Sequence, residues 1–320
     1  MMKKGQMSSM FKYIFGFIVG SMFLLFFIGF AYYYMGFAGD VGSAELVTVL
    51  DDDLTAFSVS QSAEKTLDYN MDFDLTISEA RIMSGGQTKT TDKALYSEMF
   101  LEGEVLDVAT KQLSIPFAIM NLFYLDDNSI LYVFVYDDED VYDDISVPGM
   151  LDPIAVAEDE LNLDDLSLVQ NQYSKIRFVF LTSNSHESEI SSKFANYDIL
   201  EVSSSLEDYS YGTVSYEDED VVYLGYPMLI GAIMAENAEA YSYNFDIVLS
   251  KLSVVSGVYY EKSKLLSARL PECEYSGIKT ALNNFKASLS SVESASVFYS
   301  KVENLDELNK NLGGECPEVY

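Results

Sequence analysis

The chain begins with a long apolar run. Lys12 and Asp40 bracket 27 residues without a charge, and nearly all of them are apolar. About 20 apolar residues in a helix cross the hydrocarbon core of a bilayer, whereas a cleaved secretory signal has an apolar stretch of only about 7–15. The pattern therefore predicts a retained transmembrane helix over residues 13–37, preceded by a basic N-terminus over residues 1–12.

The charges on either side of this run predict its orientation. Lys3, Lys4 and Lys12 precede it, and acidic residues follow it. Because basic flanks remain in the cytoplasm, we expect a single-pass protein of the cell membrane, with the lipid bilayer as a partner. Its N-terminus is then cytoplasmic and its C-terminal body extracellular.

Glycines within and after the apolar run suggest two further features. Gly16 and Gly20 form a GxxxG pair that allows close helix packing, so a homo- or hetero-oligomer through this helix is one interpretation. The other interpretation is that the two glycines have this spacing by chance. Gly36, Gly39 and Gly42 are expected to break the helix and to make a flexible neck over residues 38–44.

Residues 45–226 show mainly the period of two that is typical of strands. TLDYNMDFDLT (66–76) alternates strictly between apolar and polar positions, which predicts a half-buried strand. Two apolar runs flank DDNS (126–129) and predict a covered hairpin, and YGTVSYEDEDVVYLGY (211–226) predicts a second one. Segment 175–204 predicts a strand–helix–strand unit.

The acidic segment between these strands lacks a regular pattern. Residues 137–172 combine many carboxylates with Pro148-Gly149 and Pro153, so we expect a long loop with a short helix near residues 155–166. Residues 45–226 are thus predicted to form a strand-rich α/β region.

The pattern changes period in residues 227–320. Apolar residues recur every three or four positions from Ala238 to Leu266, which predicts an amphipathic helix of about 30 residues that Pro271 ends. Segments 277–289 and 302–312 predict two shorter helices that form a hairpin. The expected fold is α+β: one transmembrane helix, an extracellular mixed-sheet domain, a long amphipathic helix and a C-terminal helical hairpin.

Two cysteines flank this helical hairpin. Cys273 precedes the first short helix and Cys316 follows the second, so an antiparallel hairpin returns them to the same end. In an extracellular body such a pair favours a disulfide. Two free buried thiols are the alternative.

Composition limits the classes of partner. The chain carries 51 acidic and 19 basic residues, a net charge of −32, and 14% of its residues are aromatic. A field of this sign repels phosphate backbones, so nucleic acid is excluded as a partner. The aromatic and apolar content predicts a folded body.

We find no recognisable catalytic or cofactor signature. The only histidine is His186, so a zinc site with paired histidines cannot form. The Cys–His spacing of a metal site is absent, and no glycine-rich nucleotide motif occurs. A serine triad would need His186 as its base, without the usual motif around the serine. We therefore expect no enzyme, no cofactor and no defined metal site, although the acidic runs leave weak cation binding open.

The residues before the apolar run carry a resemblance. Lys3-Lys4-Gly5-Gln6 resembles the class III signal peptide of archaeal type IV pilin-like proteins. The resemblance implies cleavage between Gly5 and Gln6 by a prepilin-type peptidase, after which the apolar helix remains. Members of this group usually have a glutamate where this chain has Met10, and that glutamate serves filament assembly.

The expected function combines these inferences. The sequence predicts a non-enzymatic, membrane-anchored archaeal cell-surface protein with an acidic binding or structural head. The alternative is a tethered extracellular hydrolase that uses carboxylates, because 51 acidic residues offer many pairs.

Overall fold

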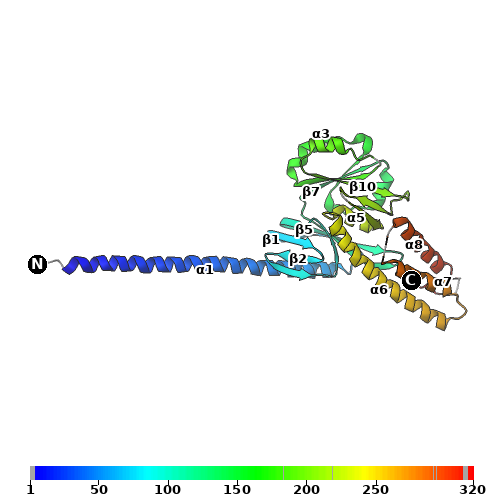
Figure 1. Cartoon of the computed structure of the whole chain (residues 1–320), viewed down its shortest axis with the longest axis horizontal. Helices are drawn as coiled ribbons and strands as arrows, with labels where there is room; N and C mark the ends of the chain where they lie inside the picture. Colours follow the sequence, from blue (N-terminus) through cyan, green and yellow to red (C-terminus); the bar gives the residue numbers. More distant parts are fainter. Residues whose placement is uncertain (1–3, 183, 218, 291, 293, 313–315) are drawn as a thin grey trace.

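The protein consists of a long N-terminal helix and a body built on two β-sheets (Figure 1). This computed structural model describes residues 4–182, 184–217, 219–290, 292, 294–312 and 316–320, and describes the backbone alone for residues 4–16, 31–41 and 70–71.

A single helix, α1 (Lys4–Phe57), runs through the predicted neck without interruption. Gly36, Gly39 and Gly42 lie inside it, so the expected break is wrong. Its last third is anchored in the body, where Leu46, Val47, Leu50 and Leu54 are buried. A glycine weakens a helix by only about 1 kcal/mol, and packing of this apolar face outweighs that cost.

The predicted transmembrane helix over residues 13–37 is not supported. Within the residues that the structure describes, no helix combines the length and the hydrophobicity that a membrane crossing requires. The transmembrane part of the expected fold and the single-pass membrane localisation are therefore wrong.

The first sheet packs against α1. Its strands are β1 (Ser62–Ser78), β2 (Arg81–Ser84), β3 (Gln87–Thr90), β4 (Ala94–Tyr96), β5 (Phe100–Ser114) and β6 (Ala118–Asp126), in the order β3-β2-β1-β5-β6-β4. The alternating segment 66–76 lies in β1, as predicted, and pairs antiparallel with β5. Leu67, Phe73 and Leu75 are buried under α1, because every second side chain of a strand points to the same face.

The second sheet contains four parallel strands. Its order is β12-β11-β10-β9-β7-β8, with strands β7 (Ile130–Tyr136), β8 (Ile154–Ala157), β9 (Lys175–Leu181), β10 (Tyr197–Ser204), β11 (Tyr211–Ser215) and β12 (Asp220–Leu224). The predicted strand–helix–strand unit is confirmed as β9, α4 (Glu187–Lys193) and β10, and the second hairpin as β11 and β12. One face of the sheet packs against α3 (Leu163–Val169) and α4.

Two predictions between the sheets are wrong. The runs before and after residues 126–129 do not form a hairpin, because β6 belongs to the first sheet and β7 to the second. Segment 137–172 is more ordered than the predicted long loop with one short helix near residues 155–166. It contains α2 (Glu139–Ile145), β8 and α3, together with three short 3-10 turns at Gly149–Leu151, Glu158–Glu160 and Gln170–Gln172. Parallel pairing of β8 with β7, which no local pattern reveals, decides this difference.

The helical segment closes the body. Helix α5 (Tyr226–Met234) has Pro227 in its first turn, contacts both sheets and is buried from Met228 to Met234. The predicted amphipathic helix is α6 (Ala238–Arg269), whose buried residues include Tyr241, Val248 and Leu252. The hairpin consists of α7 (Ser276–Ser288) and α8 (Ala295–Lys310).

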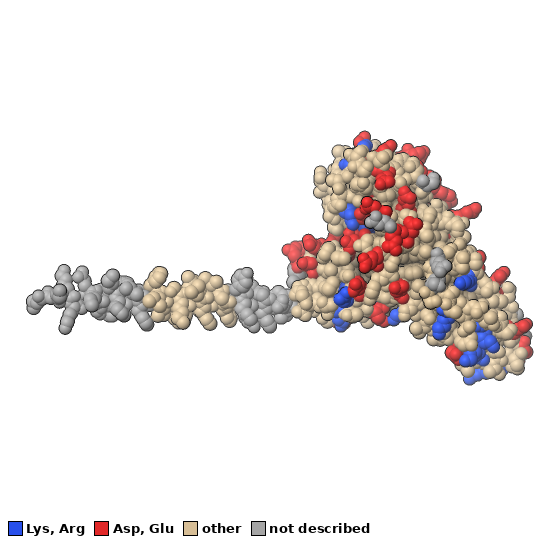
Figure 2. Space-filling view, in the orientation of Figure 1, with Lys and Arg blue, Asp and Glu red and all other residues tan. Residues whose placement is uncertain are grey.

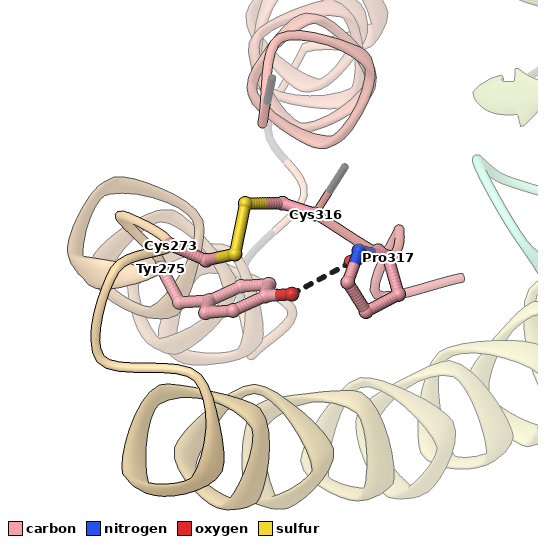
Figure 3. Close-up of a disulfide and its surroundings, with 4 residues drawn as sticks. All are labelled: Cys273, Tyr275, Cys316 and Pro317. Atoms are coloured by element: carbon pink, nitrogen blue, oxygen red, sulfur yellow. Dashed lines mark hydrogen bonds between the residues drawn. A yellow bond between two sulfur atoms is a disulfide. The ribbon is translucent and has the colours of Figure 1, made fainter. Parts of the chain in front are cut away.

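The disulfide is confirmed. The sulfur atoms of Cys273 and Cys316 lie 2.02 Å apart, and the Tyr275 hydroxyl donates a hydrogen bond to the carbonyl of Pro317 (2.9 Å; Figure 3). A loop of this size restricts the unfolded chain by about 4 kcal/mol in the chain-entropy model. The bond thus fastens the C-terminal tail, whose Val319 is fully buried.

Candidate functional site

A groove of about 740 Å³ opens on the second sheet, next to β10. It lies between the start of α4, the tip of the β11–β12 hairpin and the start of α6. Its lining residues are Ser185, Glu187, Tyr197, Asp198, Ile199, Leu200, Glu201, Ser215, Tyr216, Glu217, Glu219, Glu236, Asn237, Ala238 and Glu239. The volume is in the usual range for ligand sites, about 300–1,000 Å³.

The groove is strongly acidic. Seven of its lining residues are Asp or Glu, and none of the described lining residues is Lys, Arg or His. Figure 2 shows acidic side chains gathered where the upper part of the body meets the lower part. Residues 41–226 carry 38 of the 51 acidic residues and 8 of the 19 basic ones, so the acidity belongs mainly to the sheets. Such a surface attracts cations and repels anions.

The groove borders five successive residues of β10, from Tyr197 to Glu201. Tyr197 and Ile199 pack on the α3–α4 face of the sheet, whereas Leu200 packs in the core on the opposite face. A groove that touches successive residues of both faces must run along the edge of the strand. Pairing of β10 with β11 begins only at Glu201, opposite Ser215, so residues 197–200 pair with β9 alone in the described part of the chain.

A buried arginine contacts Asp198, one of the residues that line the groove. The Arg177 side chain is fully buried on β9, and its guanidinium contacts Glu98 (2.6 Å) and Asp198 (2.7 Å). It also donates hydrogen bonds to the carbonyls of Ile233 (2.8 Å) and Ala235 (3.0 Å), at the end of α5. One side chain therefore joins both sheets and the chain that leads into α6.

A lysine completes this network. Lys175 lies 2.7 Å from Glu98 and 2.9 Å from Asp198. Burial by itself raises the pKa of the Asp198 carboxyl, but the charges and hydrogen bonds of Arg177 and Lys175 outweigh it and lower that pKa. Asp198 is therefore held as a carboxylate whose charge is already balanced.

Glu236 behaves in the opposite way. Burial and the nearby Glu98 raise the pKa of its carboxyl. Its Oε2 atom is buried and has no hydrogen-bond partner among the described residues. An unpaired buried carboxylate oxygen is costly, so a cationic donor in the groove would stabilise it.

A second polar cluster lies at the carboxyl ends of the parallel strands. His186 Nε2 lies 3.1 Å from Glu158 Oε1, and Asn184 donates a hydrogen bond to the same oxygen (3.0 Å). Burial and a hydrogen bond with Glu158 raise the pKa of Asp137. Among the described residues, the polar partners of the His186 ring are thus an amide and a carboxylate, not the serine hydroxyl that a triad requires.

Metal ligands are not gathered in the described chain. None of its groups of three or more His, Cys, Asp or Glu side chains has an arrangement that could hold a metal ion. The acidic residues of the groove are spread along it, whereas calcium needs six to eight converging oxygens.

The residues predicted from the sequence lie elsewhere. Gly20 is in the exposed half of α1, where an added Cβ would contact nothing within 4 Å. Gly5, Gln6 and Gly16 are in α1 as well, but their surroundings lie outside the described side chains. Transmembrane packing through Gly16 and Gly20 is not retained, because the membrane-spanning prediction on which it rested is wrong.

Sequence reasoning missed the groove. One signal was present, since Arg177 interrupts the apolar strand KIRFVFLT, and a charged residue in a buried strand needs an opposite charge nearby. Its partners Glu98 and Asp198 are 79 and 21 residues away in sequence, and no local pattern marks them. Comparison with family models, curated proteins and solved structures finds no match to this chain.

Proposed function

We propose that the protein is a non-enzymatic, pilin-like assembly subunit. Its N-terminal helix packs against the same helix of other copies, and its acidic body is displayed for binding. The observation that carries this proposal is the contrast between an apolar, exposed stretch of α1 over residues 17–30 and its last third, which is built into the body.

The exposed apolar stretch of α1, residues 17–30, is expected to be buried against another apolar surface. Large apolar residues in 17–30 are between 55% and 78% exposed: Phe17, Ile18, Met22, Phe23, Leu24, Leu25, Phe26, Phe27, Ile28 and Phe30. Residues 22–28 are consecutive, so they occupy the whole circumference of the helix. A patch of this size marks an interaction site. A single docking surface covers one side of a helix, whereas a bundle of copies covers all sides.

The continuity of α1 supports the same proposal. A pilin normally continues its first helix into the globular head, and α1 does so without a neck. The resemblance at Lys3-Lys4-Gly5-Gln6 adds cleavage between Gly5 and Gln6 by a prepilin-type peptidase, which leaves the helix on the mature protein. Met10 replaces the usual glutamate, so packing of apolar side chains has to stabilise the assembly.

The test compares oligomeric state. In the triple variant Phe23→Ser/Leu24→Ser/Phe27→Ser we expect dissociation to monomers in sedimentation velocity, with an unchanged circular dichroism spectrum from the body. The control is Leu168→Ser, which removes a 77% exposed leucine far from α1. The proposal is wrong if the parent chain is monomeric or if the triple variant sediments as the parent does.

The processing step has its own measurement. After co-expression with a prepilin-type peptidase, we expect intact mass to show a mature chain that begins at Gln6. A chain that keeps Met1 would remove peptidase processing from the proposal and leave the packing of α1 to the sedimentation test.

A second candidate function is a hydrolase that uses carboxylates. It is favoured by the presence in one groove of Glu236, with a raised pKa, and Asp198, with a lowered one, since acid–base pairs are separated in this way. Two cations already neutralise Asp198, which makes it a weak base and favours binding. A panel of glycoside and peptide substrates tests this candidate, and turnover that Glu236→Gln abolishes would establish it.

A further inference from the structure

We infer that the open edge of β10 binds an extended peptide with lysine or arginine side chains, which joins the second sheet as an added strand. The inference rests on the shape, the main chain and the charge of the groove, and it is independent of the association of α1.

The main chain of residues 197–200 defines where the added strand would lie. Residues 197–200 are hydrogen-bonded to β9 on one side, and the position of a neighbouring strand on their other side is taken up by the groove. Four residues of strand span about 13 Å. Unpaired N–H and C=O groups along such an edge are a template for a further strand, a known mode of peptide recognition.

The ends of the groove fit an extended chain. At one end β11 pairs with β10 from Glu201 onward, so an added strand must stop there. At the other end lie Glu236 and Asn237, which connect α5 to α6. A segment of about four or five residues fills this distance, and its side chains alternate between the two faces of the sheet.

Charge selects the side chains of the peptide. Of the seven acidic lining residues, Asp198 is the one that the described structure pairs with cations. The other six are Glu187, Glu201, Glu217, Glu219, Glu236 and Glu239. A lysine or arginine directed toward Glu236 would also supply the missing donor for its buried Oε2.

Two other classes of ligand fit less well. Nucleic acid would bring phosphates to a groove in which no basic residue lines the described wall. A free metal ion lacks a converging set of ligands in the described residues. A cationic peptide uses both the carboxylates and the strand edge.

The experiment uses the full chain and three fluorescent pentapeptides. The probe is Lys-Val-Lys-Val-Lys, which has a high strand propensity and three charges. One control, Glu-Val-Glu-Val-Glu, reverses the charge. The other has the sequence of the probe with N-methylated backbone amides, which keeps the charge but removes the donors that a strand needs. Binding is followed by fluorescence anisotropy at 50 and 200 mM NaCl.

We expect the probe to bind, the acidic control not to bind, and the methylated control to bind at least tenfold more weakly. Glu236→Gln should weaken the probe about tenfold, the usual size of one charge-assisted hydrogen bond. Asp164→Asn, which removes an exposed carboxylate on α3, is the matched control and should leave affinity unchanged. Hydrogen exchange of amides in 197–201 should slow when the probe is bound.

Three results would overturn the inference. If the probe does not bind, the groove is not a peptide site. If the methylated peptide binds as well as the probe, attraction is electrostatic and no strand is added. If Glu236→Gln and Asp164→Asn affect binding equally, the peptide lies outside the groove. None of these results depends on whether α1 associates, which sedimentation measures separately.

Discussion

Two sets of carboxylates lie where the two sheets meet, and their surroundings differ: in the described part of the chain, one set contacts cations and the other does not. Glu98 and Asp198 contact Arg177 and Lys175 at 2.6–2.9 Å, so their charges are balanced. Asp126 ends β6 and is only 4% exposed. Its carboxylate accepts a hydrogen bond of 3.3 Å from the backbone N–H of Asn128.

The two surroundings shift the pKa values of these carboxyls in opposite directions. The cations lower the pKa of Asp198, whereas burial, together with the neighbouring Asp127, raises the pKa of Asp126 to about 7. The nearby cations therefore favour the ionised form of Asp198, whereas burial without a cation favours the protonated form of Asp126. The paired set fixes the groove, and the unpaired residue makes the connection between the sheets sensitive to pH.

The largest expected effect comes from removing the buried cation. Arg177→Met leaves Glu98 and Asp198 with Lys175 alone and removes two hydrogen bonds to α5. We expect the free energy of unfolding at pH 7.5 to fall by about 3–5 kcal/mol, measured by urea denaturation. The folded-state pKa of Asp198 is lowered, so its stabilising contribution is present above its unfolded pKa and disappears as pH falls. The loss should therefore shrink toward pH 3.5.

The control for this change is Lys193→Met. Its Nζ lies 2.6 Å from Asp164, but the Asp164 side chain is 83% exposed. Exposed pairs contribute about 0–1 kcal/mol, so this variant should unfold almost as the parent does. Equal losses in the two variants would contradict the assigned role of Arg177.

The second prediction concerns Asp126, where a substitution is expected to raise the stability of the protein and not to lower it. The folded-state pKa of Asp126 is raised, so the folded protein binds the proton more tightly, and the parent loses stability as pH rises from about 4 to 7. Asp126→Asn imitates the protonated carboxyl at every pH. At pH 8 it should be more stable than the parent by on the order of 2–4 kcal/mol, and at pH 4 the two should be equal.

Thermal unfolding of both proteins between pH 4 and pH 8 measures this difference. Asp72→Asn changes an exposed aspartate on β1 and serves as the control, with no expected change. A difference between Asp126→Asn and the parent that stays constant with pH would show that the aspartate does not titrate on folding.

The smallest effect is expected in the groove. Burial and Glu98 raise the pKa of Glu236, but its side chain is only partly buried. Glu236→Gln should therefore raise stability at pH 8 by less than Asp126→Asn does, in the same thermal measurement. A larger gain than that of Asp126→Asn would reverse the order of the two unpaired carboxylates.

Local patterns predicted much of the body. The strict alternation in β1, the three-and-four spacing in α6 and the turn residues of the β11–β12 hairpin each depend on neighbours within a few residues. The disulfide followed from the same reasoning, because two short helices return Cys273 and Cys316 to one end. The groove could not be predicted, because its walls come from β10, a hairpin tip and α6.

The sequence by itself determined which segments are apolar, where the period changes and how strongly acidic the chain is, since these depend only on the order of residues. Only the tertiary structure decided that DDNS joins two sheets, that α1 continues through its glycines, and that Arg177 meets Glu98 and Asp198. The physical reason is that pairing between distant strands and burial of a charge depend on which surfaces pack together, and distant parts of the chain supply those surfaces.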